Sequence, residues 1–389
     1  MTRATLVEPA RLTDWARRLV ATPSPQTALF EHEPDVQAFL SGPVVAFLEE
    51  IGLPYRRDGM GSVIVEMGSG DEPSLMLMAY AMTHPANRMT DAFGATLVEG
   101  GARLRGRGVA EQKGALTAAL AAVAAVRERA FRGRLVLAVT SAGETGRHDA
   151  AASVLDALGY IPAMTVIVVG TSGRLALANK GRIDVEVTVR GRAAHSSTPA
   201  AGIDAIAGAR RVLDRVLALD VGGRAHPGLG AATLAATAIR SWPEATHTIQ
   251  DEVRLVFDRR LLPGDDPDAA FDAIARVADI GPPWEVDCRR GPHMFPAEIA
   301  ADGPLARAVA AGCAARGLPQ PAPFFSHGAL DAGLLCARGG EAAMWGPGET
   351  ALWHSDEESI ALSDLRSGAE AYLGLIETVL GHAPSGSEC

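Results

Sequence analysis

Four short stretches of the sequence carry side chains that could do chemistry. Glu111 stands in "RGRGVAEQKGAL", at the start of an Ala-rich segment, and Glu144 follows an apolar run in "AVTSAGETGRHD". His195 lies in "GRAAHSSTPAAGIDA", and His354 lies in "MWGPGETALWHSDEESI". Carboxylate oxygens and imidazole nitrogens bind divalent metals and transfer protons. Each of these residues also has a purely structural interpretation, because an acid in the first turn of a helix, for example, is favoured by the helix dipole alone.

A fifth stretch, "SLMLMAYAMTHP", raises the question of what its polar end does. Residues 75–79 are uncharged and predict a strand that is covered on both faces. In an open α/β sheet, chemistry gathers just beyond the carboxyl ends of the strands. Tyr80, Met82 and His84 follow this strand directly, so they belong either to a site or to the rim of the core.

The elements around these stretches alternate between apolar strands and Ala-rich helices. This βαβ order predicts a mixed, largely parallel sheet with flanking helices, that is, an α/β domain. The expected strands cover residues 61–67, 75–79, 133–141 and 164–170, and the expected helices cover 112–130 and 148–159. A further amphipathic helix is expected in the first twenty residues.

The pattern changes near residue 182. Residues 182–192, "RIDVEVTVRGR", alternate strictly between apolar and polar side chains, as in a half-exposed antiparallel strand. The order that follows, β-α-β-β-α-β, is that of a ferredoxin-like α+β module. We therefore predict an inserted domain over 182–291, and a first domain formed by residues 1–181 together with 292–389.

Composition excludes several classes of function. A formal charge of −10 argues against a nucleic-acid surface, and no apolar run reaches the roughly 18 residues of a membrane span. The N-terminus lacks the apolar stretch of a signal peptide, so we expect a cytoplasmic protein.

P-loop, dinucleotide and nucleophile-elbow motifs are missing from the sequence. The cysteines are widely spaced and predict reduced thiols: Cys288, Cys313, Cys336 and Cys389.

Taken in chain order, the stretches "GRGVAEQKG", "GET", "VRGRAAHSSTPAAGIDAI", "DRRLLPG" and "GPGETALWHSDEESI" resemble the M20 family of metallopeptidases and deacylases. The family includes acetylornithine and succinyl-diaminopimelate deacylases. The resemblance covers almost the whole chain and implies a zinc-exopeptidase-like catalytic domain with two zinc ions. It also implies an inserted lid domain through which two subunits usually pair, which suggests a homodimer.

Compared with that family, this chain lacks part of the metal centre. The resemblance places Tyr80 where the family has a histidine ligand, and Met82 where it has the aspartate that orients this ligand. Gly143 replaces the glutamate that serves as general base, and Thr171 replaces an acidic ligand. One of the two metal half-sites is therefore expected to be lost.

The other half-site keeps its ligands. The resemblance implies that Glu111, Glu144 and His354 hold one divalent metal, with Zn²⁺ as the first candidate and Mn²⁺ or Fe²⁺ as alternatives. Binding of no metal at all stays open. Tyr80 is a poor metal ligand because a phenol has a pKa near 10. His84 is a candidate replacement, although a His-Pro pair at a strand end is typical of a turn.

The substrate-binding residues implied by the resemblance are better preserved. His195 matches a lid histidine that, in the family, reaches the partner subunit's site and helps polarise the scissile carbonyl. Arg260 matches an arginine that binds a substrate carboxylate, although an ion pair on the strand surface is an alternative for Arg260. His247 stands where the family usually has asparagine. The turn at Gly346 and Gly348 offers backbone N–H groups to a carboxylate. A small carboxylate-bearing substrate is thus expected.

Three hypotheses follow for the function. The first is a one-metal amidohydrolase that acts on an N-acyl amino acid or dipeptide, with His84, Tyr80 or the substrate in place of the missing base. The second is a non-hydrolytic enzyme on the same scaffold, such as a lyase, isomerase, cyclase or acyl transferase. The third is a non-catalytic homologue that retains only the pocket and the dimer.

Overall fold

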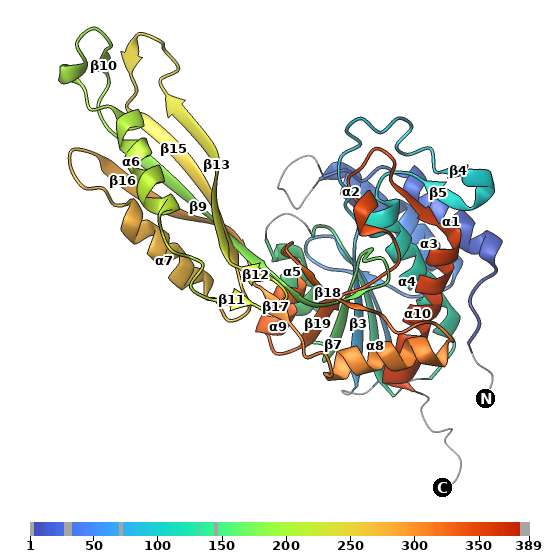
Figure 1. Cartoon of the computed structure of the whole chain (residues 1–389). Helices are drawn as coiled ribbons and strands as arrows, with labels where there is room; N and C mark the ends of the chain where they lie inside the picture. The colour runs from blue at the N-terminus through green and yellow to red at the C-terminus, as the bar shows by residue number, and fades with distance from the viewer. Residues whose placement is uncertain (1–3, 27–32, 70–72, 131, 144–146, 382–389) are drawn as a thin grey trace. The chain divides into compact units, whose positions relative to one another are not determined.

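The structure is a computed structural model that describes residues 4–26, 33–69, 73–130, 132–143 and 147–381. The chain divides into two compact units, and each is described by itself. Unit 1 comprises Met1–Ala178, Ala297–Phe325 and Asp331–Cys389, and unit 2 comprises Asn179–Pro296 and Ser326–Leu330. The fold class is mixed α/β, as the sequence predicts (Figure 1).

Unit 1 is built on a six-stranded sheet in the order β1-β2-β6-β3-β7-β19. Strands β6, β3, β7 and β19 run parallel, while β1 and β2 are antiparallel additions at one edge. All seven residues of β3 are buried, because this strand has neighbours on both sides and helices over it. The strands are β1 (Arg56–Arg57), β2 (Val63–Ser69), β3 (Ser74–Tyr80), β6 (Gly133–Thr140), β7 (Met164–Val168) and β19 (Glu341–Met344).

Helix α4 (Gly114–Val126) is the central helix of unit 1 and packs against β3, α1 and α10. Its sequence "GALTAALAAVAAV" has no polar face, and its small alanines let α10 approach closely. The segment Val109–Val126 is long and apolar enough to cross a membrane, but 94% of it is buried within the protein. The other helices of unit 1 are α1 (Pro9–Ala21), α2 (Pro34–Phe39), α3 (Val45–Glu50), α5 (Asp149–Leu158), α8 (Pro304–Ala315), α9 (Ala332–Ala337) and α10 (Leu362–Leu380).

Two small sheets, which the sequence patterns do not predict, complete unit 1. One has the order β20-β5-β4, with β20 (Ser359–Ala361), β5 (Arg103–Arg105) and β4 (Thr96–Val98). The antiparallel pairing of β20 with β5 brings the segment before residue 359 beside the segment after residue 105. The other small sheet has the order β17-β8-β18, with β17 (Ala297–Glu298), β8 (Leu175–Asn179) and β18 (Pro323–Ser326).

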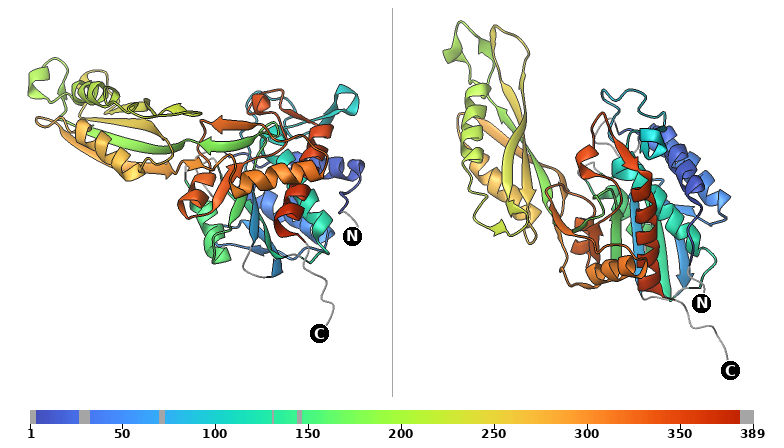
Figure 2. Two further views of the ribbon diagram at one scale, coloured as in Figure 1. Left: turned by 60° about the horizontal axis from the view of Figure 1, so that its bottom comes forward. Right: turned by 45° about the vertical axis from the view of Figure 1, so that its right-hand side comes forward.

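Unit 2 contains a four-stranded antiparallel sheet in the order β13-β15-β9-β16, and α6 and α7 pack against its strands (Figures 1 and 2). This is the strand order of a ferredoxin-like module. The elements are β9 (Gly181–Arg190), α6 (Ala205–Leu217), β13 (Thr233–Trp242), β15 (Glu252–Leu261), α7 (Pro267–Ala278) and β16 (Glu285–Met294). Four short strands form two separate two-stranded sheets, β10 (Ala194–His195) with β14 (Thr248–Ile249) and β11 (Ala225–His226) with β12 (Gly230–Ala231).

Strand β9 shows the predicted alternation in its core face. Ile183, Val185, Val187 and Val189 are fully buried against the helices of unit 2. The opposite face is less exposed than its polar residues suggest, since Asp184 is only 6% exposed and pairs with Arg182 at 2.6 Å.

Three boundaries differ from the sequence-based ones. Unit 2 extends to residues 179 and 296, beyond the predicted 182 and 291, because β16 continues to Met294, which pairs with Arg182 of β9. The predicted N-terminal helix begins only at Pro9, whose fixed φ suits the first turn of a helix.

Candidate active site

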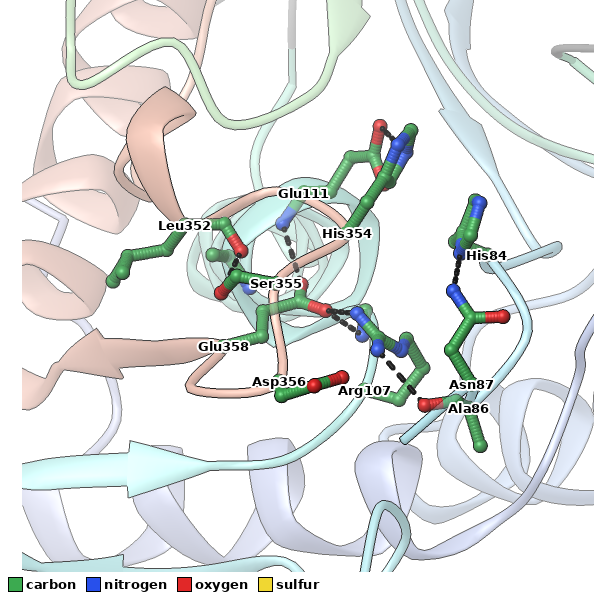
Figure 3. A network of polar contacts seen from close by, with 12 residues as sticks. His84, Ala86, Asn87, Arg107, Glu111, Leu352, His354, Ser355, Asp356 and Glu358 are labelled. Carbon is green, nitrogen blue, oxygen red and sulfur yellow. Dashed lines mark hydrogen bonds and ion pairs between the residues drawn. The ribbon is translucent and has the colours of Figure 1, made fainter. Parts of the chain in front are cut away.

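Glu111 lies at the start of the helical segment that runs into α4, and a second carboxylate fixes the backbone around it. The turn at Gly108 has a φ of +81°, and a one-turn π-helix, Val109–Lys113, follows. Glu358 accepts hydrogen bonds from the backbone N–H groups of Gly108 (2.9 Å) and Ala110 (3.0 Å) and pairs with Arg107 at 2.8 Å (Figure 3). Both members of this ion pair are fully buried, so the N-terminus of the helix is held rigidly.

The side chain of Glu111 meets that of His354. Glu111 is 1% exposed, and His354 Nε2 lies 3.1 Å from each of its two carboxylate oxygens (Figure 3). His354 follows the short turn η5 (Thr350–Leu352) and has a φ of +58°, a conformation that is uncommon for residues other than glycine. Such local strain is often found at functional sites.

The separation of these atoms suits a shared metal ion. Two ligand atoms that each lie about 2.0–2.2 Å from one tetrahedral zinc ion are separated by about 3.3–3.6 Å. The 3.1 Å between His354 Nε2 and each Glu111 oxygen is slightly shorter than this and is the distance of an ordinary hydrogen bond, so the two side chains would separate by a few tenths of an ångström to hold an ion. Within the described residues, no three His, Cys, Asp or Glu side chains are grouped to hold a metal. The third predicted ligand, Glu144, lies outside the described residues.

Lys113, two residues after Glu111, is buried and makes contacts that hold neighbouring helices in place. Burial lowers the pKa of its ammonium group to about 7, although the nearby Glu358 acts in the opposite direction. Its Nζ donates a hydrogen bond of 2.6 Å to the Thr22 carbonyl and lies 4.6 Å from the centre of the Phe39 ring. Lys113 therefore anchors α1 and α2 to the segment that carries Glu111.

Tyr80 fills the space beside Gly143. Tyr80 is completely buried at the end of β3, and its hydroxyl accepts a hydrogen bond of 3.3 Å from the Asp331 N–H. A Cβ atom added at Gly143 would lie 2.3 Å from Tyr80 Cδ1. The lack of a side chain at position 143 is thus matched by the aromatic ring at position 80.

The residues that hold Tyr80 include a pair that the sequence did not reveal. Asp331 Oδ1 lies 2.7 Å from His148 Nδ1, and both side chains are buried. The partners are 183 positions apart in the chain. Neither stands in a motif, so no sequence signal pointed to this pair.

His84 lies against the Glu111–His354 pair. Its imidazole stacks on that of His354 with ring centres 4.1 Å apart, and its Nδ1 lies 3.2 Å from Asn87 Nδ2. Figure 3 shows both histidines on the same side of the segment that contains Glu358. The loop after β3 therefore contributes His84 to the site, whatever its chemical role.

The predicted carboxylate-binding turn contacts Thr171. The Gly346 N–H donates a hydrogen bond of 3.1 Å to Thr171 Oγ1, and the Ser172 N–H donates one of 2.7 Å to the Gly348 carbonyl. Thr171 in turn donates to the Arg174 carbonyl at 2.6 Å. Because the Gly346 N–H already has an acceptor, substrate binding by this turn stays a prediction.

In unit 2, the structure brings His195 and His247 together. The pairing of β10 with β14 places their ring centres 5.9 Å apart, and both residues are exposed. The Ser197 N–H donates to His195 Nδ1 at 3.2 Å. A backbone amide can only donate, so Nδ1 is unprotonated in the neutral ring and Nε2 carries the proton.

Arg260 forms an ion pair within its own strand. Its Nε lies 2.9 Å from Asp258 Oδ1, and its Nη2 lies 3.1 Å from Asp258 Oδ2. Its Nη1 is 3.5 Å from the His327 carbonyl oxygen. This two-point contact is the strand-surface alternative to substrate binding, and a substrate carboxylate would have to share the guanidinium with Asp258.

Comparison with known families identifies the chain. Residues 83–378 match the family described as Peptidase family M20/M25/M40. The protein is a member of this family. The match covers most of the chain and includes Glu111, His195, Arg260 and His354.

Individual relatives agree with this family. The chain is 28% identical over 356 residues to a protein of Pyrobaculum aerophilum named as a LysW-lysine/LysW-ornithine hydrolase, covering 90% of this chain and 94% of that one. It is 27% identical over 334 residues to acetylornithine deacetylase of Myxococcus xanthus, covering 82% and 83%.

Solved structures show the same fold. An M20 family metallo-carboxypeptidase from Sulfolobus solfataricus has a TM-score of 0.75 at 14% identity and covers 96% of this chain and 99% of that one. A dinuclear metal-binding M20 peptidase from Bacillus subtilis has a TM-score of 0.68 at 16% identity, covering 95% and 98%.

Proposed function

We propose that this M20 family member is an amidohydrolase that uses one divalent metal ion to remove the acyl group of a small N-acylated, carboxylate-bearing amine such as an N-acyl amino acid or dipeptide. The observation that supports it most directly is the contact between His354 Nε2 and both oxygens of the buried Glu111. Glu111 and His354, together with Glu144, would hold the ion. When bound, a divalent metal lowers the pKa of water and polarises a carbonyl group.

The chain's own residues supply the remaining functions. His195 can donate its Nε2–H to the oxygen of a scissile carbonyl as negative charge develops there. Arg260 in unit 2 and, separately, the Gly346–Gly348 turn in unit 1 are each candidates for binding a substrate carboxylate. His84, which stacks on His354, is the described residue best placed to accept a proton near the reacting centre. Tyr80 is fully buried and would act as packing, without touching the substrate in this conformation.

One observation favours the second hypothesis, a non-hydrolytic reaction on the same scaffold. The Tyr80 ring occupies the space that a side chain at position 143 would need, so a carboxylate base does not fit there in the present packing. Loss of a general base typically costs about 10²–10⁴-fold in rate. A lyase, isomerase, cyclisation or acyl-transfer reaction would not need water to be activated. Under the third hypothesis, a non-catalytic homologue would retain only the substrate-binding pocket and the dimer.

Metal content is the first test. We would measure metal per chain by elemental mass spectrometry for the wild type, Glu111→Gln, His354→Ala and the control His195→Ala. We expect about one zinc, manganese or iron ion in the wild type and the control, and a loss of most of it in the two ligand variants. Equal metal content in all four proteins, or less than about 0.2 ions per chain in the wild type, would refute the proposed site.

Turnover then separates the two reactions. A panel of N-acetyl and N-succinyl amino acids would be incubated with the enzyme in ¹⁸O-water. Hydrolysis places ¹⁸O in the released acid, whereas a lyase, isomerase or transfer reaction forms products without it. Release of labelled acid that a chelator abolishes supports the amidohydrolase.

We also propose a cytoplasmic homodimer that pairs through unit 2. Strand β13 is at the edge of the sheet, and among the described strands it pairs only with β15. Most of its residues are exposed, including Ile239 at 58%. An exposed edge with apolar side chains is a template for pairing with another strand.

The oligomeric state tests this proposal. We expect the wild type to have the mass of a dimer by light scattering, and Ile239→Arg to be a monomer. Leu97→Arg is the matched control, since Leu97 is 40% exposed on β4 of unit 1. A monomeric wild type, or an Ile239→Arg variant that stays dimeric, would rule out pairing through β13.

A further inference from the structure

His195 and His247 form a pair of imidazoles on the surface of unit 2. Strands β10 and β14 pair antiparallel with His195 opposite Thr248, and the Ser196 N–H donates a hydrogen bond of 2.9 Å to the His247 carbonyl. The two ring centres lie 5.9 Å apart. The backbone on both sides of the pair is therefore held together, while both side chains stay exposed.

The loop that carries His247 is also held by contacts of its own. The Gln250 side-chain amide donates to the carbonyls of Ala245 at 3.3 Å and Thr248 at 3.2 Å, and the Thr248 N–H donates to the Ala245 carbonyl at 3.2 Å. Among the residues that the structure describes, none donates a hydrogen bond to the His247 ring or accepts one from it, and its only ring contact is His195. Both nitrogens of the His247 ring are thus available to a substrate.

The His195 ring is oriented by its neighbour. Its Nδ1 accepts a hydrogen bond of 3.2 Å from the Ser197 N–H and lies 2.8 Å from Ser197 Oγ. These contacts leave Nε2 as the nitrogen of His195 that can reach a substrate. The pair therefore consists of one ring with a fixed donor position and one ring with two available nitrogens.

Hydrolysis of an amide needs a proton donor as well as a base. The leaving nitrogen has to be protonated, because an amine leaves as a neutral molecule and not as its anion. The group that takes a proton from the nucleophile commonly gives it to the leaving amine afterwards. Position 143 is glycine in this chain, so the carboxylate that the family resemblance implies for this purpose is missing.

We propose that His247 is the general acid that protonates the leaving amine, while His195 binds the carbonyl oxygen of the same amide. This role rests on the proposed amidohydrolase function. The oxygen and nitrogen of an amide are about 2.3 Å apart. Two donor nitrogens that hydrogen-bond to them from different sides are therefore roughly 4–6 Å apart. Rings whose centres are separated by 5.9 Å can provide this spacing.

In this reaction, the oxygen of water forms a bond to the acyl carbon, and a proton of the water goes to the base, for which His84 is the candidate. The C–N bond breaks, and its electron pair stays on the nitrogen. The imidazolium of His247 gives a ring proton to that nitrogen. The products are the acid and the amine, and exchange with solvent returns both histidines to their starting states.

Matched amide and thioester substrates separate the two roles, because a thiol has a pKa near 8.5 and can leave as the thiolate. We would compare N-acetyl- and N-succinylglycine with S-acetyl- and S-succinylthioglycolate, which differ only in the leaving atom. In His247→Asn, we expect kcat/KM to fall about 10²-fold for the amide and to stay within about threefold for the thioester. In His195→Ala, both should fall by a similar factor, because both substrates develop negative charge on the carbonyl oxygen.

Two further variants complete the test. His247→Gln keeps a hydrogen-bond donor that cannot transfer a proton, so it should behave like His247→Asn. Glu244→Gln, on an exposed position of the same loop, is the control and should change neither rate. Equal losses for amide and thioester in His247→Asn, or amide turnover within about threefold of the wild type, would overturn the role of His247 and leave the amidohydrolase intact. A wild type that hydrolyses none of the four compounds would overturn both.

Discussion

The contact between Gly143 and Tyr80 gives a sharp prediction about stability. Replacing Gly143 by alanine adds a single methyl group. That group would lie 2.3 Å from Tyr80 Cδ1 and 2.6 Å from two further ring atoms. Ordinary contact begins near 3.4 Å, so the ring would have to withdraw by about 1 Å or more. The ring has little room to do so, because Tyr80 is completely buried at the end of a central strand.

The expected cost follows from two effects. Overpacking of a well-packed core typically destabilises by about 1–3 kcal/mol. Moving the ring also weakens the hydrogen bond that Tyr80 accepts from the Asp331 N–H, worth about 0.5–1.5 kcal/mol. We therefore expect Gly143→Ala to lower the free energy of unfolding by about 2–4 kcal/mol.

Urea denaturation followed by circular dichroism would measure this change. Gly42→Ala is the matched control, because a Cβ atom there meets nothing within 4 Å and alanine favours a helix. In a double-mutant cycle, Gly143→Ala should cost much less when Tyr80 is already alanine. A Gly143→Ala variant within about 0.5 kcal/mol of the wild type, or additive effects in the cycle, would refute the steric argument.

Three further predictions concern other parts of the chain. Glu358→Gln should lower the free energy of unfolding by about 3–5 kcal/mol in urea denaturation, because it leaves the charge of the buried Arg107 without the carboxylate that pairs with it at 2.8 Å; a loss below 1 kcal/mol would contradict this. Burial raises the pKa of the Cys313 thiol to about 11, so at pH 8 about one molecule in a thousand carries the thiolate, and iodoacetamide labelling mapped by mass spectrometry should be slow until the protein unfolds. Asp204→Ala should cost about 1 kcal/mol in the same urea assay, because Asp204 caps α6 by accepting from the Ile206 N–H at 2.8 Å, whereas Asp204→Asn should cost little.

The periodic elements of both units could be predicted from the sequence. Strand β3 is a run of apolar residues and lies in the centre of a parallel sheet, and the alternation in 182–192 matches the buried face of β9. The ferredoxin-like order was also predictable, because each of its strands and helices has a clear period. Short strands such as β10 and β14, each of two residues, are set by tertiary contacts and leave no period to detect.

Residues of the candidate active site could be predicted only where they stand in a recognisable sequence motif. Glu111 and His354 stand in recognisable stretches, and the structure brings them together across 243 positions. The contact of Tyr80 with Gly143 depends on the register between β3 and β6, which the sequence does not encode locally. The same holds for His148 and Asp331, whose contact arises from how α5 and α9 pack onto the sheet.

The fit between Gly143 and Tyr80 also has a consequence for how this chain can change by mutation. Starting from the present sequence, a carboxylate at position 143 cannot be gained in one step, because every side chain there collides with the ring. Position 80 has to become smaller first, and that intermediate carries a cavity in the core, which for an aromatic side chain typically costs several kcal/mol. Both single-step routes pass through a destabilised protein. The present pair of residues is therefore expected to persist through neutral drift, and laboratory selection for a carboxylate base at position 143 has to begin from a library that varies both positions together.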